Sequence, residues 1–175
     1  MKKYFAEFIG TLLLTLIACG IAVITNANLP ITAAAFGLVI VACSYMFGNI
    51  SGSHINPAVS LSMLLTNKMN FKDFVGYVIS QFAGAICGSL LLWIILGSRA
   101  FLGANGYGEG TLATTVWIAL LVEIILTFIF ILVVLCVTSK KENSKISGIV
   151  IGLAIMLVNL FGIKFTGTSV NPARS

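Results

Sequence analysis

The sequence predicts an all-α membrane protein built as an inverted repeat of helices. Three observations predict it. Long uncharged apolar segments recur along the chain, two stretches match at an offset of 115 residues (Asn56 and Asn171), and both contain the triplet Asn-Pro-Ala. Hydrophobic residues make up 59% of the 175 positions and charged residues only 9%. A soluble domain carries far more charge than this.

Five segments are long and apolar enough to cross a bilayer, because about 20 apolar residues span its hydrocarbon core. They cover about residues 4–25, 31–50, 74–96, 112–138 and 146–164. Since they recur over the whole length, they are not a cleaved signal peptide. We expect one transmembrane channel domain over residues 1–175, with a first repeat over about 1–98 and an incomplete second repeat over about 112–175.

The placement of basic residues predicts the orientation, because cytoplasmic segments of membrane proteins are enriched in lysine and arginine. With the N-terminus inside, the outer segments hold only Arg99, Lys164 and Arg174. The inner segments hold Lys2, Lys3, Lys68, Lys72, Lys140, Lys141 and Lys145. We therefore expect a multi-pass protein of the cell (plasma or inner) membrane with a cytoplasmic N-terminus. The net charge of +5 then gives no reason to expect a nucleic-acid partner.

The internal repeat is visible residue by residue. Residues 37–58 read GLVIVACSYMFGNISGSHINPA, and residues 152–173 read GLAIMLVNLFGIKFTGTSVNPA. Glu7 and Glu123 also correspond, each followed by a threonine four positions later. Three spans per half is an odd number, so the second copy must start on the opposite side of the membrane. Such inverted repeats are a common plan of transport proteins whose site lies near the bilayer midplane.

Each Asn-Pro-Ala triplet predicts the start of a short helix inside the membrane. Asparagine is a favoured N-cap and proline a favoured first helical residue. Residues 57–66 would form a half-helix of roughly 15 Å, half the hydrocarbon thickness. The two N-termini would meet near the midplane, and the carbonyls of residues 52–55 and 167–170 would accept hydrogen bonds along a path. This arrangement favours a polar neutral molecule and opposes cations and protons. The triplet residues are Asn56, Pro57, Ala58, Asn171, Pro172 and Ala173.

With these residues, the chain resembles the aquaporins, the major intrinsic protein family, over its whole length. The stretches AEFIGTLLL, SGSHINPAVS, NGYGEG and TSVNPARS carry the resemblance. It implies a helical bundle of six spans with two re-entrant half-helices, usually a homotetramer with one pore per subunit. It also implies a channel for water or small neutral solutes, with no cofactor. Five of the six implied spans are present.

The resemblance further implies a narrow filter outward of the paired asparagines, formed here by Phe36, Asn159, Thr168 and Arg174. Three of these match water-selective bacterial members, whereas Asn159 stands where histidine is usual. Asparagine is shorter and neutral, so a slightly wider filter is expected. Glycerol facilitators usually carry a tryptophan in the second span and an aspartate after the arginine. This chain has Phe36 and Ser175 at these positions. We favour water, with leakage of small solutes left open.

Three further polar residues each allow two interpretations. A carboxylate inside a membrane is costly and is a functional candidate, so Glu7 and Glu123 could relay protons. The resemblance suggests instead that each braces a re-entrant loop, which we favour. His54 could respond to pH or serve as a fixed partner of its loop, and we favour the second.

One histidine without clustered carboxylates gives no metal site. Because no nucleophile–base set or phosphate loop occurs, we do not expect an enzyme.

Four functions stay open at this point. A passive water channel leads, followed by a glycerol or small-solute facilitator, an ion-coupled transporter, and an inert scaffold or inactive truncated product. The inactive truncated product is considered because only residues 172–175 follow Asn171. One turn is too short to sustain a helix by itself. We expect these residues to belong to a longer protein, and the 175-residue chain alone not to form a selective pore.

Overall fold

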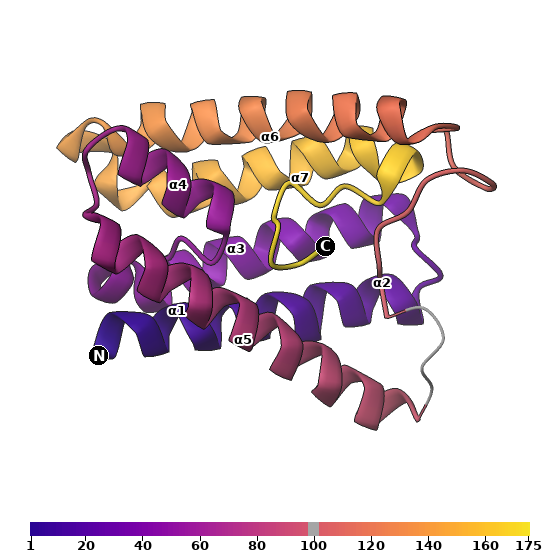
Figure 1. Cartoon of the computed structure of the whole chain (residues 1–175), viewed down its shortest axis with the longest axis horizontal. Helices are drawn as coiled ribbons and strands as arrows, with labels where there is room; N and C mark the ends of the chain where they lie inside the picture. The colour runs from indigo at the N-terminus through magenta and orange to yellow at the C-terminus, as the bar shows by residue number, and fades with distance from the viewer. Residues whose placement is uncertain (98–101) are drawn as a thin grey trace.

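The computed structural model describes residues 1–97 and 102–175 as a bundle of long helices, and this part of the chain contains no strand (Figure 1). The first rod is continuous and changes its winding along its length, from α1 (Lys2–Leu13) through the π-helical segment η1 (Leu14–Cys19) to α2 (Gly20–Ile24). The other long helices are α3 (Leu29–Ser51), α5 (Phe71–Leu96), α6 (Val116–Thr138) and α7 (Ser147–Thr166). A short 3-10 turn, η2 (Lys141–Lys145), joins the last two. These are the five predicted spans, each long and apolar enough to cross a membrane.

Polar residues fix where the helices begin. The side chain of Asn28 accepts a hydrogen bond from the Ile31 backbone N–H at the start of α3. Asn70 caps α5 in the same way, and Thr115 caps α6. Each cap satisfies one of the backbone N–H groups that a helix leaves unpaired at its first turn.

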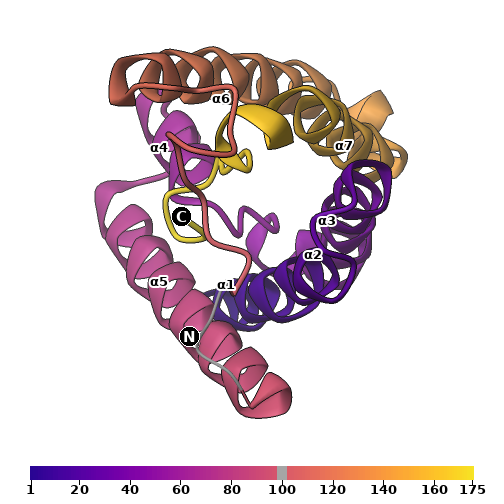
Figure 2. The same ribbon diagram turned by 90° about the vertical axis from the view of Figure 1, so that its right-hand side faces the viewer.

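Glycines allow the long helices to pack closely. A side chain on Gly37 of α3 would meet the backbone oxygen of Gly152 in α7 at 2.8 Å. On Gly84 of α5, it would collide with the backbone oxygen of Phe8 in α1. Small residues at such crossings are typical of helix packing in membranes, where backbones approach each other closely. Seen end on, the rods form an arc that runs from α6 through α7, α3 and α1 to α5 (Figure 2). The short helix α4 (Pro57–Leu65) and the C-terminal segment lie within this arc.

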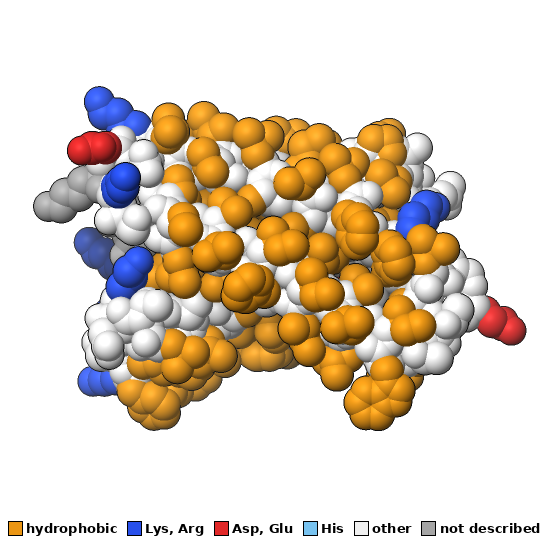
Figure 3. Space-filling view, turned by 90° about the horizontal axis from the view of Figure 1, so that it is seen from above, with side chains coloured by type: hydrophobic (Ala, Val, Ile, Leu, Met, Phe, Trp, Pro, Cys, Tyr) orange, Lys and Arg blue, Asp and Glu red, His pale blue; other side chains and the backbone are white. Residues whose placement is uncertain are grey.

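The surface matches a membrane protein. Apolar side chains cover the sides of the bundle, and charged side chains gather at its two ends (Figure 3). At the N-terminal end, Lys3 forms a salt bridge of 2.7 Å with Asp73, which also accepts a hydrogen bond from the Tyr4 hydroxyl. Two of the predicted orientation signals, Arg99 and the Lys141 side chain, lie outside what the structure describes.

Candidate functional site

Two re-entrant loops of the same conformation enter the bundle from opposite ends. In the first, Gly52, Ser53 and Ile55 have φ values of 83°, 51° and 42°. The residues at the matching positions of the second loop are Gly167, Thr168 and Val170, with φ values of 80°, 47° and 44°. Positive φ is rare for branched residues such as isoleucine and valine. Such strain persists only where surrounding contacts enforce it, and it clusters at functional sites.

Glu7 provides those contacts for the first loop. Its side chain is completely buried in α1. One carboxylate oxygen, Oε1, accepts hydrogen bonds from the Ser51 hydroxyl at 2.6 Å and the His54 backbone N–H at 2.9 Å. The other oxygen, Oε2, accepts from the Ile55 backbone N–H at 2.6 Å and from the Gln81 side-chain amide at 2.8 Å. The carboxylate therefore holds both ends of the strained segment.

Glu123 of α6 holds the second loop through equivalent bonds. Its Oε1 accepts from the Thr166 hydroxyl at 2.5 Å and from the Ser169 backbone N–H at 2.9 Å. Its Oε2 accepts from the Val170 backbone N–H at 2.9 Å. Hydrogen bonds to a charged acceptor are roughly twice as strong as neutral ones. Both carboxylates thus accept hydrogen bonds from backbone N–H groups of the loop that follows in their own half of the chain.

The two asparagines of the triplets tie the loops to each other. The Asn56 side-chain amide donates to the Val170 carbonyl at 2.8 Å, and the Asn171 amide donates to the Ile55 carbonyl at 2.9 Å. The last carbonyl of each loop thus already accepts one hydrogen bond from within the protein. Each of these two oxygens accepts a hydrogen bond from the opposite asparagine.

Both asparagines also cap the turn that follows them. Asn56 Oδ1 accepts from the Ala58 backbone N–H at 2.8 Å and begins α4, which carries Pro57 at its first position. Asn171 Oδ1 accepts from the Ala173 backbone N–H at 3.1 Å. In this second half a single turn follows, in which the Arg174 N–H donates to the Asn171 carbonyl at 3.0 Å.

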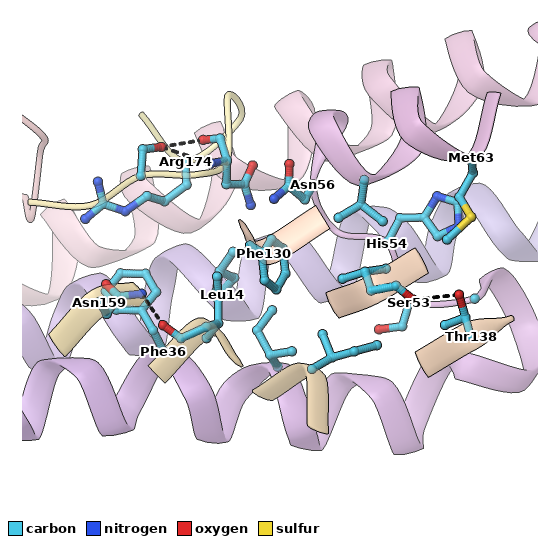
Figure 4. A pocket seen from close by; sticks show the side chains of 18 of the residues that line it. Leu14, Phe36, Ser53, His54, Asn56, Met63, Phe130, Thr138, Asn159 and Arg174 are labelled. Carbon is cyan, nitrogen blue, oxygen red and sulfur yellow. Dashed lines mark hydrogen bonds between the residues drawn. The ribbon is translucent and has the colours of Figure 1, made fainter. Parts of the chain in front are cut away.

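A cavity of about 220 Å³ runs between the two loops and the long helices. It extends from Arg174 at one end, past Asn56, to Ser53, Met63 and Thr138 at the other (Figure 4). One part of its lining is apolar and comes mainly from the long helices: Leu14, Phe36, Ile40, Phe130, Val134, Ile151 and Ile155. The polar part comes mainly from the loops: Gly52, Ser53, His54, Asn56, Ser169, Asn171 and Arg174.

Three of the four predicted filter residues, Phe36, Asn159 and Arg174, line this cavity. The Arg174 guanidinium lies 5.1 Å from the centre of the Phe36 ring. The Asn159 amide donates to the Ile155 carbonyl of its own helix at 2.8 Å, and its Oδ1 has no partner among the described residues. Thr168 is buried with its hydroxyl against Gly162 of α7, and it is not among the residues that line the cavity.

Comparison with known proteins agrees with this geometry. The family model described as "Major intrinsic protein" matches residues 1–175. The chain belongs to the major intrinsic protein family. Members of this family are membrane channels for water or small solutes.

Relatives within the family carry different names. An "Aquaporin Z" of Brucella melitensis is 38% identical over 187 aligned positions, covering 100% of this chain and 82% of the relative. A "Glycerol uptake facilitator protein-like 6" of Lactiplantibacillus plantarum is 36% identical over 182 aligned positions, with the same shares covered. The X-ray structure of the aquaglyceroporin from Plasmodium falciparum has the same fold, with a TM-score of 0.85 at 24% identity. That alignment covers 99% of this chain and 77% of the other.

His54 lies against the loop it belongs to. Its ring Nδ1 is 3.1 Å from the Ser60 hydroxyl oxygen, and the ring packs on Tyr77 with centroids 5.0 Å apart. The Tyr77 hydroxyl in turn donates to the Ser51 carbonyl at 2.7 Å. Sequence reasoning missed Tyr77 and Gln81 as loop supports. For Gln81 a signal was available, because an amide inside an apolar span needs a partner.

Proposed function

We propose that this member of the family is a passive channel for water that excludes protons and ions. The observation that carries the proposal is the two-sided lining of the cavity. Polar groups of the loops follow one side from Arg174 to Ser53, while Phe36, Ile40 and Phe130 lie among the apolar residues of the other. Water molecules can exchange hydrogen bonds along the polar side, and the apolar side offers none that would hold them. A water molecule then passes at little cost in free energy, because it binds weakly at several successive positions.

The proposed exclusion of cations follows from positive charge at two places along the cavity. The helix α4 directs its N-terminal end, with its partial positive charge, toward the cavity at Asn56. Arg174 adds a full positive charge at the outer end. A cation or an excess proton would have to pass both, in a cavity without an acidic lining residue among those described. Glu7 and Glu123 are not among the residues that line this cavity.

The preference for water over glycerol is supported by the filter itself. Phe36 contributes a bulky ring, and the cation of Arg174 lies over it. Asn159 leaves one unpaired oxygen in this region, which could accept a hydrogen bond from a passing hydroxyl group. We therefore propose a water channel with a small residual permeability to glycerol. The names of the two relatives, one an aquaporin and one a glycerol facilitator, are compatible with this mixed behaviour.

Stopped-flow light scattering of proteoliposomes tests the proposal. With sucrose as the osmolyte, vesicles with the protein should shrink clearly faster than protein-free vesicles. With glycerol, the shrinkage should be followed by slow re-swelling, because glycerol enters slowly. Re-swelling as fast as shrinkage would favour the glycerol facilitator, and shrinkage at the protein-free rate would contradict both.

A matched pair of variants assigns the flux to this pore. Arg174→Val removes the cation at the outer end and should retain water flux while admitting urea, glycerol or protons. Lys164→Val removes a cation at the same end of the bundle, outside the cavity lining, and should change nothing. Unchanged solute and proton permeability in Arg174→Val would argue against this filter.

We also propose a homotetramer in the cell membrane with a cytoplasmic N-terminus. Exposed apolar residues such as Trp117, Leu121 and Phe128 on α6 support a surface that faces lipid or a neighbouring subunit. The lysines at the N-terminal end of the bundle support the orientation. Light scattering of the detergent complex measures the subunit number, and protease accessibility of a tag at Met1 in right-side-out vesicles measures the orientation.

A further inference from the structure

The outer loop that follows α5 contacts the filter through Gly103. The Gly103 carbonyl accepts a hydrogen bond of 2.9 Å from Nη2 of Arg174. The other two guanidinium nitrogens, Nε and Nη1, have no hydrogen-bond partner among the described residues. The Gly103 carbonyl therefore holds Nη2 of Arg174, and the Cys19 side chain also lies close enough to interact with the guanidinium, so the position of the filter cation depends on both the loop and the first rod.

Gly103 is itself seated on the first transmembrane rod. It is buried, its φ is 77°, and a Cβ atom at this position would lie 2.9 Å from Cβ of Cys19. The same atom would lie 3.2 Å from both Cα and the backbone oxygen of Cys19. Only a residue without a side chain can lie this close to backbone atoms that cannot move aside.

Cys19 is the last residue of the π-helical segment η1, and it is almost completely buried. Wide π-turns are rare in helices and are found mostly at functional sites. Leu14, at the other end of η1, lines the cavity. The segment thus contributes to the cavity with its first residue and carries the loop contact with its last.

We propose that the contact between Gly103 and Cys19 is a positioning site that holds the Arg174 guanidinium against the side of the pore. The proposal rests on the water-channel function for its consequence, but the contact itself does not depend on it. When Gly103 is displaced, Arg174 loses its acceptor. The Oδ1 atom of Asn159, which also lacks a partner and belongs to the same cavity lining, becomes the acceptor for the guanidinium. The outer end of the pore then narrows.

The variant Gly103→Ala tests this contact, with Gly110→Ala as the matched control. Gly110 lies in the same loop with a φ of 81°, and no atom lies within 4 Å of a Cβ placed on it. Both substitutions therefore introduce the same backbone strain, and only the first collides with Cys19. Differences between the two variants report the contact and not the general cost of alanine at positive φ.

The first measurement does not use water flux. A charged methanethiosulfonate is added to the detergent-solubilised protein, and mass spectrometry of peptides follows the adduct at Cys19. We expect labelling in Gly103→Ala to be about tenfold faster than in the parent and in Gly110→Ala, a factor that one overpacked methyl group can produce. Cys43 is buried elsewhere and should keep its rate in all three proteins. Equal rates at Cys19 would overturn the contact, whatever the protein conducts.

The second measurement is a double-mutant cycle in water permeability. Gly103→Ala should lower the permeability about threefold or more, since one hydrogen bond to a charged group corresponds to about tenfold in an equilibrium. The same substitution should have no effect in an Arg174→Val background, because the narrowing requires the guanidinium. A loss that persists without Arg174 would overturn the positioning role. If the parent protein conducts no water, the proposed function fails, while the labelling rates still decide the contact.

Discussion

Replacing Glu7 by glutamine tests how strongly one carboxylate braces the first loop. The substitution keeps the size of the side chain and converts one acceptor oxygen into an NH₂ donor. In either orientation of the new amide, its NH₂ group would stand where one carboxylate oxygen now stands. The two donors that now bond to that oxygen would then face another donor. They are either the Ser51 hydroxyl and the His54 N–H or the Ile55 N–H and the Gln81 amide.

The magnitude follows from the bonds that cannot be replaced. The Ser51 hydroxyl can rotate, and Gln81 can turn its own unpartnered Oε1 toward the new NH₂ group. One backbone N–H, of His54 or Ile55, has no such alternative. An unsatisfied buried donor costs about 1–3 kcal/mol, and each remaining bond loses about 1 kcal/mol when its acceptor becomes neutral. With two bonds remaining on the other oxygen, Glu7→Gln should lower the free energy of unfolding by about 3–5 kcal/mol.

Chemical denaturation of the protein in detergent micelles measures this loss, and osmotic shrinkage of proteoliposomes measures the accompanying fall in water permeability. Glu109→Gln is the control, because Glu109 is exposed in the loop between α5 and α6 and its substitution should cause no measurable loss of stability. A loss below about 1 kcal/mol for Glu7→Gln would refute the bracing argument, since it is less than one orphaned N–H costs. A fall in proton flux with unchanged stability would support a proton relay instead.

Three further outcomes are expected. Gly37→Ala should destabilise the protein by about 1–3 kcal/mol, because the new methyl group would collide with Gly152. Gly48→Ala in the same helix has open space at its Cβ and should be neutral or slightly stabilising, and the denaturation midpoints of the two variants test this difference. Asn159→His should narrow the filter and slow the glycerol re-swelling of proteoliposomes while water flux falls little, and an identical solute profile would remove Asn159 from the constriction. Asn56→Asp replaces the donor to the Val170 carbonyl with a negative charge, so water flux should fall and cation leakage should rise, as a potential-sensitive dye can record.

The fold could be predicted from the sequence because the bilayer restricts what an apolar chain can do. Backbone groups in lipid must pair within a helix, so uncharged runs of sufficient length become spans with few alternatives. The start of α4 was equally predictable, because the Asn56-Pro57 pair is a local signal that acts through its own helix.

Contacts between distant segments could not be predicted in the same way. The hydrogen bonds from Asn56 to Val170 and from Asn171 to Ile55 join residues 114 and 116 positions apart, and they depend on the depth at which the two loops meet. The sequence predicts that the loop carbonyls can accept hydrogen bonds, but it does not identify these two asparagine donors. The contact of Gly103 with Cys19 likewise has no local signature, because a glycine in a loop usually indicates only a turn.

A pore that passes water and excludes protons can be tested for both properties in the same vesicles. Proteoliposomes loaded with a pH-sensitive dye are exposed to an osmotic step and, separately, to a pH step with valinomycin present to remove the membrane potential. We expect osmotic shrinkage much faster than that of protein-free vesicles, together with a proton influx equal to theirs. Shrinkage at the protein-free rate, or a proton influx that rises with the amount of protein, would contradict it.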